Sequence, residues 1–159
     1  ARLEDKIRPL AELRLLVPQL QAQGKRVVFT NGCFDLLHAG HIKFLEEARR
    51  LGDALVVAVD SDESVRQVKG EGRPIIGEGD RLRILAALAA VDYVTVFTSH
   101  QLPELLATLR PDLLTKGSNY PAEQVAGAEI VHRYGGQVVL LPVTEPVSAS
   151  DLIQRIKDG

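Results

Sequence analysis

The sequence is poor in the features that mark secreted, membrane and nucleic-acid-binding proteins. It has one cysteine, Cys33, which cannot form an internal disulfide, so we expect a reducing compartment and a cytoplasmic protein. No apolar run approaches the length of a membrane span, and the first residues lack the apolar core of a signal peptide. The net charge of −2 gives no basic excess. We therefore expect no membrane and no nucleic-acid partner.

Short β-branched runs alternate with longer helical patterns along the chain. Its 159 residues are the length of one ordinary domain, so we predict a single domain over 1–159, with 1–24 as a helical segment packed on it. The predicted strands are 26–30, 55–59, 93–97, 112–115 and 137–141. The predicted helices are 9–22, 40–51, 80–90 (capped by Asp80), 101–109, 121–134 and 149–157. This alternation predicts an α/β Rossmann-like three-layer sandwich, a five-stranded parallel sheet with helices on both faces.

Ligands of such sheets bind beyond the carboxyl ends of the strands. Four segments follow predicted strands at that edge, so we expect the site residues to come from 30–41, 60–74, 116–120 and 143–151. The first of these contains Asn31-Gly32, which is typical of a turn.

The segment 30–41, TNGCFDLLHAGH, carries two histidines three residues apart at the start of a predicted helix. Helix N-termini attract phosphates, and two imidazole donors there would make a compact phosphate clamp. Two alternatives remain open at this point. His38 and His41 could chelate a metal, or Cys33 could act with a histidine as a nucleophile, although a small apolar residue after a strand explains Cys33 better.

TNGCFDLLHAGH resembles the signature of the HxGH cytidylyltransferase-like nucleotidyltransferases. The resemblance runs from about residue 10 to 157, and its later segments are similar to one branch, the D-glycero-β-D-manno-heptose 1-phosphate adenylyltransferases of ADP-heptose synthesis. Those segments are 52–62, 69–74, Arg81, 91–93, 111–112, 116–120 and 125–136. The resemblance implies that a phosphate oxygen of the acceptor attacks the α-phosphate of ATP and that pyrophosphate leaves, with Mg²⁺ accompanying the triphosphate.

The resemblance also implies roles for individual residues. The catalytic group would be His38, His41 and Lys43. The nucleotide would be bound by Thr30, Asn31, Gly32, Cys33, Phe34, Gly40, Arg81, Lys116, Gly117, Ser148 and Ser150. The first five of these would approach it through backbone groups. The acceptor would be bound by Asp35, Asp60, Lys69 and Arg73. Asp35 could also position a histidine or help to hold Mg²⁺ through water, and it could equally cap the turn.

Two positions depart from the family pattern. Many sequences of the heptose branch have Asn where this chain has Asp60, and Ser148-Ala149-Ser150 replaces the usual Ser-Thr-Thr or Ser-Ser-Thr. The first departure bears on the acceptor, and the second removes one hydroxyl from a predicted phosphate contact.

The resemblance leaves alternatives for the function. Besides adenylyl transfer to the heptose phosphate, we consider cytidylyl transfer from CTP to glycerol 3-phosphate or a similar small phosphate, and a nucleotide-binding regulator without catalysis. There is no P-loop, which argues against a kinase. We expect a separate sugar kinase to supply the acceptor, and family habit suggests a homodimer.

Overall fold

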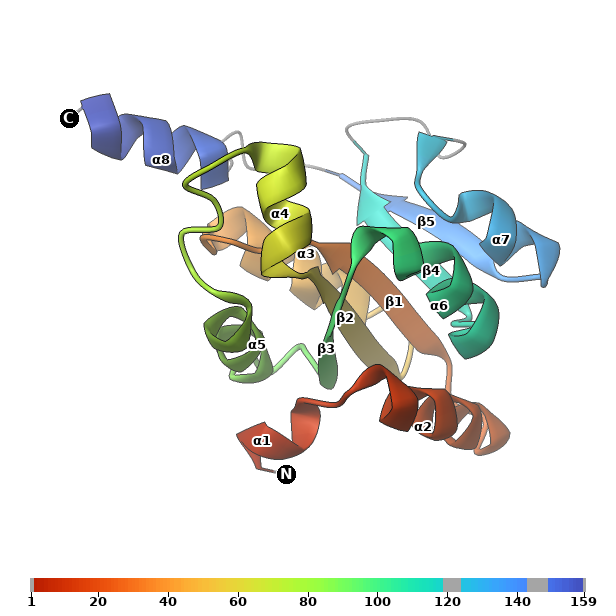
Figure 1. Cartoon of the computed structure of the whole chain (residues 1–159). Coiled ribbons are helices and arrows are strands. Elements are labelled where there is room, and N and C mark those ends of the chain that lie inside the picture. Colours follow the sequence, from red (N-terminus) through yellow and green to blue (C-terminus); the bar gives the residue numbers. More distant parts are fainter. Residues whose placement is uncertain (1, 119–123, 143–148, 159) are drawn as a thin grey trace.

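The computed structural model describes residues 2–118, 124–142 and 149–158 (Figure 1). Five parallel strands form one sheet in the order β3-β2-β1-β4-β5. Their bounds are β1 Val27–Gly32, β2 Ala54–Asp60, β3 Tyr93–Phe97, β4 Leu113–Gly117 and β5 Gln137–Leu141. The chain runs outward from β1 to β3 on one side and then returns to build β4 and β5 on the other. The topological switch point therefore lies between β1 and β4.

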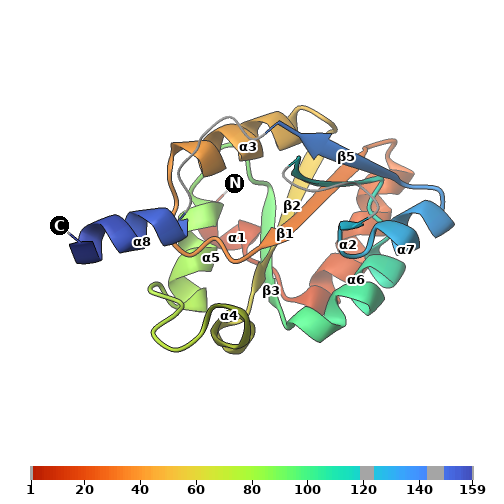
Figure 2. The same cartoon turned by 90° about the horizontal axis from the view of Figure 1, so that it is seen from above.

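Helices cover both faces of the sheet (Figures 1 and 2). Their bounds are α1 Leu3–Lys6, α2 Leu10–Ala22, α3 Ala39–Arg49, α4 Asp62–Lys69, α5 Glu78–Ala86, α6 Leu102–Leu109, α7 Ala128–Arg133 and α8 Ala149–Asp158, with a 3₁₀ turn η1 at Ser99–Gln101. One core packs α2, α6 and α7 against the sheet, and the second packs α3 and α5 against its other face. The predicted Rossmann-like three-layer sandwich is confirmed.

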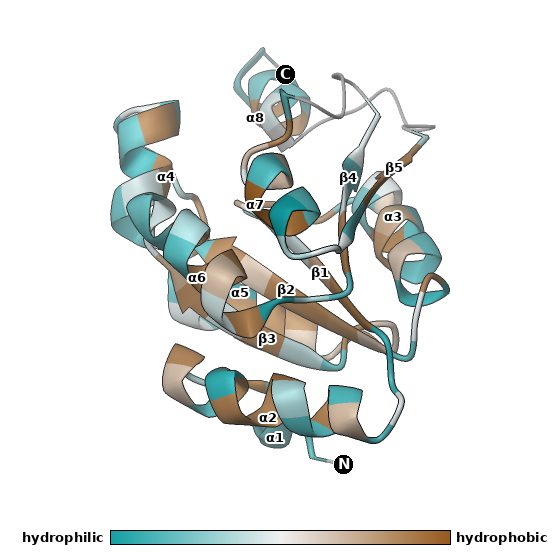
Figure 3. Ribbon diagram, turned by 90° about the vertical axis from the view of Figure 1, so that its right-hand side faces the viewer, coloured by the Kyte–Doolittle hydropathy of each residue, from teal (hydrophilic) through white to brown (hydrophobic). Residues whose placement is uncertain are grey.

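The strands are apolar because both of their faces are covered. Six of the seven residues of β2 are buried, and its neighbours Val56 and Val57 belong to opposite cores. Figure 3 shows the brown, hydrophobic strands between helices whose outer faces are teal. A parallel sheet buried on both faces is expected to have such continuous apolar strands.

The N-terminal segment packs on the sheet in two ways. Leu13, Val17 and Leu20 of α2 are buried in the first core, while Ile7 forms a parallel bridge to Val94 of β3. Within the described part of the chain, no helix has the length and apolar character needed to cross a bilayer.

Four local predictions were wrong. The helix predicted over 121–134 is shorter, because α7 begins only at Ala128, after its N-cap residue Gly127. Asn31 and Gly32 do not turn but continue β1, where they pair with Ala58 and Val59 of β2. The segment 60–74, predicted as a loop, contains α4, whose N-cap Ser61 accepts the N–H of Ser64 on its hydroxyl. Helix α5 starts at Glu78 after the N-cap residue Gly77, so Asp80 lies inside its first turn and caps nothing.

Candidate active site

The predicted site residues meet at the carboxyl edge of the sheet, around the switch point. The Lys116 ammonium, at the end of β4, donates to the carbonyl oxygen of Asn31 at the end of β1 over 2.5 Å. Burial lowers the pKa of Lys116, and the carboxylate of Asp60 partly offsets that effect. A bound phosphate would add a second anionic partner and further favour the charged form of this buried ammonium.

His38 and His41 begin α3 as a reciprocal cap. Nδ1 of His38 accepts the N–H of Gly40 over 3.1 Å, and Nδ1 of His41 accepts the N–H of His38 over 3.2 Å. The ring centroids are 3.9 Å apart. A nitrogen that accepts a backbone N–H carries no proton, so the neutral tautomer of each ring has its proton on Nε2. The pair therefore offers two N–H donors at a helix N-terminus.

The His41 ring is neutral at physiological pH. Burial is the larger cause and the neighbouring His38 the smaller one, and together they lower the pKa of His41 from 6.5 to about 4. The Phe34 ring contributes to this apolar environment, with its centroid 5.7 Å from that of His41. His41 can thus donate a hydrogen bond to a phosphate oxygen without carrying a charge itself. Gly40, in the first turn of α3, donates its N–H to His38, and Lys43 is exposed further along the helix.

Asp35 is not placed to bind an acceptor, hold a metal or orient a histidine. It is only 2% exposed, and its carboxylate accepts the N–H groups of Ile75 and Ile76 and the Nε–H of Arg73 at 2.8–2.9 Å. Burial raises the pKa of this carboxyl, but the hydrogen bonds from Ile76, Ile75 and Arg73 outweigh it and the net pKa is below its ordinary value. We correct its role to that of an internal anchor for the loop after α4.

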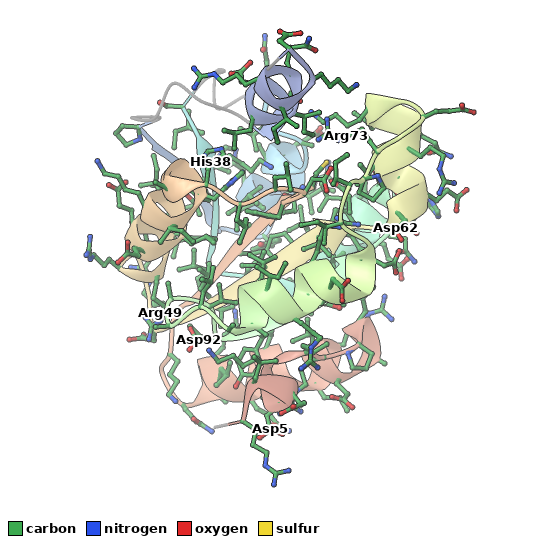
Figure 4. The ribbon with its side chains drawn as sticks, turned by 90° about the vertical axis from the view of Figure 1, so that its left-hand side faces the viewer. Asp5, His38, Arg49, Asp62, Arg73 and Asp92 are labelled. Carbon is green, nitrogen blue, oxygen red and sulfur yellow. The ribbon has the colours of Figure 1, made fainter. Side chains whose placement is uncertain are left out.

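Arg73 reaches two predicted parts of the site. Besides its ion pair with Asp35, its guanidinium lies 3.4 Å from the hydroxyl of Ser150 at the start of α8. Figure 4 shows His38 and Arg73 at the same end of the molecule, away from Arg49 and Asp92 at the other end of the sheet. Ser148 lies outside the described residues.

The role of Arg81 is also corrected, because its side chain is enclosed by protein. Thr30 is enclosed as well, but it was expected to approach the nucleotide through its backbone, and that expectation stays a prediction. The Arg81 side chain has no exposed surface and donates to the carbonyls of Ile76 and Cys33 and to the carboxylate of Asp62. Thr30 is 1% exposed, and its hydroxyl donates to the carbonyl of Thr115, which ties β1 to β4. Neither side chain presents a surface to a nucleotide in this structure.

Cys33 and Asp60 lie side by side at the ends of β1 and β2. The thiol donates to the Asp60 carboxylate over 3.5 Å, and Ser99 of η1 donates to the other carboxylate oxygen over 3.3 Å. Burial raises the pKa of the Cys33 thiol, and the charge of Asp60 raises it further. A thiol held protonated is a poor nucleophile, which argues against the Cys–His alternative. Lys69, exposed at the end of α4, acts on the thiol in the opposite direction.

Sequence reasoning missed Ser99. It follows β3, the one strand whose trailing loop was not counted at the carboxyl edge, although the same rule places that loop beside Asp60. Gly117 was placed correctly at this edge, where it pairs with Leu141 of β5. The described residues contain no group of three or more His, Cys, Asp or Glu side chains arranged to hold a metal ion.

A hollow of about 400 Å³ lies at the opposite, amino edge of the sheet, lined by residues that include Arg26, Arg110 and Tyr134. It contains none of the predicted site residues. Asp112 also lines this hollow, and its carboxylate accepts the N–H of Val27 at the start of β1. This carboxylate therefore stabilises the start of the strand.

Comparison with known proteins identifies the family. The family model described as cytidylyltransferase-like matches residues 29–155, which include the histidine pair and all five strands except the first two residues of β1. The chain belongs to the cytidylyltransferase-like family. Among solved structures, it is similar to a lipopolysaccharide core biosynthesis protein from Thermoplasma volcanium, with 29% identity and a TM-score of 0.63 over 78% of this chain and 100% of that one.

Other relatives differ in their sequence identity to this cytidylyltransferase-like chain and in the share of each chain that the match covers. It is 55% identical to the bifunctional protein HldE of Desulfatibacillum aliphaticivorans and 48% identical to that of Geobacter sulfurreducens, over 98% and 96% of this chain. The chain spans about a third of the length of these relatives, 32% and 31%. A pantoate-beta-alanine ligase from Francisella tularensis shares the fold, with a TM-score of 0.63 at 14% identity over 95% of this chain and 76% of that one.

Proposed function

We propose that this chain transfers AMP from ATP to D-glycero-β-D-manno-heptose 1-phosphate, which gives ADP-heptose and pyrophosphate. The observation that carries the proposal is the stacked, mutually capped pair of His38 and His41, whose Nε2–H groups are left to donate at the start of α3. The likeness to HldE and to the lipopolysaccharide core biosynthesis protein supports the choice of branch.

In the proposed reaction an oxygen of the sugar phosphate forms a bond to the α-phosphorus of ATP. The bond from that phosphorus to the bridging oxygen breaks, and pyrophosphate leaves with the electron pair. Charge accumulates on the α-phosphate and on the leaving group, and donors already in place stabilise it without reorganising. His38 and His41 would supply imidazole N–H donors, and the N–H groups of the first turn of α3 would supplement them.

Cationic side chains would complete the binding of the two anionic substrates. Lys116 is held at the switch point, and Arg73 lies beside Ser150. Lys43 and Lys69 are exposed and lie close in sequence to other predicted site residues. Mg²⁺ bound to the triphosphate would neutralise part of its charge. We propose that activity requires Mg²⁺ and that the phosphate oxygens are its principal ligands, since the Asp35 carboxylate is already occupied.

CTP is the alternative donor, favoured by the match to a cytidylyltransferase-like family model. A ligand that binds only the folded state raises its melting temperature, so a thermal-shift titration with Mg²⁺ and either ATP or CTP tests the choice. We expect ATP to give the larger shift at equal concentration. Pyrophosphate release with each nucleotide, offered heptose 1-phosphate or glycerol 3-phosphate, then tests the acceptor. A larger shift with CTP, or turnover only with glycerol 3-phosphate, would overturn the assignment.

The proposed reaction also implies partners. A sugar kinase must supply the heptose 1-phosphate, and the word bifunctional in the relatives' name is consistent with a second activity nearby in the pathway. We propose that the protein is a homodimer and that it is cytoplasmic. The proposed localisation rests on the free thiol of Cys33, because free thiols are typical of reducing compartments. Size-exclusion chromatography with light scattering measures the assembly directly.

A further inference from the structure

Two buried charged side chains fasten the loop after α4 to the loop after β1. Asp35 lies in the loop after β1, and its carboxylate accepts the N–H groups of Ile75 and Ile76 over 2.9 Å. Arg81, from α5, donates Nε–H to the carbonyl of Ile76 over 2.9 Å and a second N–H to the carbonyl of Cys33 over 2.6 Å. Both residues are nearly inaccessible, at 2% and 1% exposed.

Phe34 lies between the two points of attachment. Its φ of 50° is in the left-handed region, which a bulky side chain rarely adopts and which persists only where the surroundings enforce it. The carbonyl before it, that of Cys33, is held by Arg81, and the carboxylate after it, that of Asp35, is held by the loop amides. The unfavourable conformation is therefore fixed from both sides.

This backbone conformation determines where the Phe34 ring lies. The ring packs on Gly32, where a Cβ would come within 3.0 Å of its Cε2 atom, and it faces the His41 ring at 5.7 Å with the planes tilted by 54°. A side chain on residue 32 would displace the ring. The ring in turn covers one side of the imidazole that offers its Nε2–H to the site.

We propose that Arg81 and Asp35 are positioning residues for the transferase reaction: together they hold Phe34 in its left-handed conformation, and the Phe34 ring fixes the orientation and the apolar surroundings of His41. The inference rests on the proposed function for its kinetic consequences. It replaces the direct contact between Arg81 and the nucleotide that the family resemblance implied.

The pKa of His41 distinguishes this positioning role from a merely structural one. The pKa of His41 is about 4 because the ring is buried, and the titratable neighbour that acts on it is His38. If the Phe34 ring provides part of that burial, its removal raises the pKa of His41 toward 6.5. An NMR titration of the imidazole nitrogens measures this pKa without any substrate, so its failure is distinguishable from failure of the proposed function.

The experiment compares Phe34→Leu and Arg81→Lys with Arg83→Lys, a matched control exposed on the same helix. For Phe34→Leu and Arg81→Lys we expect the His41 pKa to rise by about one unit and kcat to fall about 10-fold, while KM for ATP changes less than about 3-fold. Arg83→Lys should behave as wild type. If Arg81→Lys fails to fold, Phe34→Leu alone still tests the proposal.

Two results would overturn the proposal. The first is an unchanged His41 pKa in folded Phe34→Leu. The second is an Arg81→Lys protein whose KM for ATP rises about 10-fold or more while its His41 pKa and kcat stay at wild-type values, because that pattern belongs to a residue that binds the nucleotide uniformly in ground and transition states.

Discussion

The rings of His38 and His41 lie 3.9 Å apart at the start of α3, and each accepts a backbone N–H on Nδ1. The contacts that cap the helix use Nδ1 of each ring and leave Nε2 for the proposed substrate. If the proposed function holds, capping and catalysis are combined in two side chains, and a substitution can separate them only if it keeps an acceptor for the backbone N–H and removes the Nε2–H donor.

His38→Asn is such a substitution. An Asn side-chain oxygen can accept the N–H of Gly40 as Nδ1 does now, since Asn is a favourable N-cap residue, but the Nε2–H donor is lost. We expect kcat to fall by about 10²-fold, as after removal of one preorganised donor to a transition state, with the melting temperature nearly unchanged. His38→Ala should lose both activity and stability. Near-normal turnover of either variant would exclude a direct role for His38.

His41 should make the fold sensitive to mild acid. Its pKa is about 4 in the folded protein and 6.5 ordinarily, so between these values the unfolded chain binds the extra proton and stability falls as the pH falls. Below about pH 4 both states are protonated and this loss stops. Urea unfolding of wild type and His41→Asn from pH 7 to 4 measures it. We expect a shallower loss in the variant; equal slopes would show that the folded-state pKa is not depressed.

Cys33→Ser should keep most of the activity. The thiol is held protonated by burial and by Asp60, and the proposed reaction has no covalent intermediate on the enzyme. The serine hydroxyl can still donate to the Asp60 carboxylate. Steady-state pyrophosphate release checks this, with circular dichroism as the control for folding. A folded Cys33→Ser protein without activity would revive the nucleophile hypothesis.

Gly127→Ala and Gly24→Ala separate backbone strain from steric clash. Both glycines have positive φ, +88° and +82°, but a Cβ on Gly127 would lie 2.2 Å from Cδ1 of the buried Leu106, whereas one on Gly24 would meet nothing within 4 Å. Gly24→Ala should cost about 1 kcal/mol of the free energy of unfolding. Gly127→Ala should cost about 1–3 kcal/mol more, because the core is overpacked. Urea titrations that gave equal losses would contradict the packing around Leu106.

The sheet could be predicted because strands buried on both faces must be apolar, as β2 is along almost its whole length. Helix α4 was missed because Val65 and Ser64 are its only buried residues, so its sequence looks like that of a polar loop. The histidine pair was found because its spacing and its place after a strand are local features. Nothing local distinguishes Asp35 and Arg81 from ligand-binding charges, since their burial depends on how α5 and the loop at 73–76 pack against the segment that follows β1.

The most direct test of the account is the reaction itself. Purified protein is given ATP, Mg²⁺ and D-glycero-β-D-manno-heptose 1-phosphate, and pyrophosphate and ADP-heptose are quantified together, beside a variant with alanine at both His38 and His41. The account predicts equal amounts of the two products from wild type and almost none from the variant. Bound ATP with no product from wild type, or equal rates from both proteins, would contradict it.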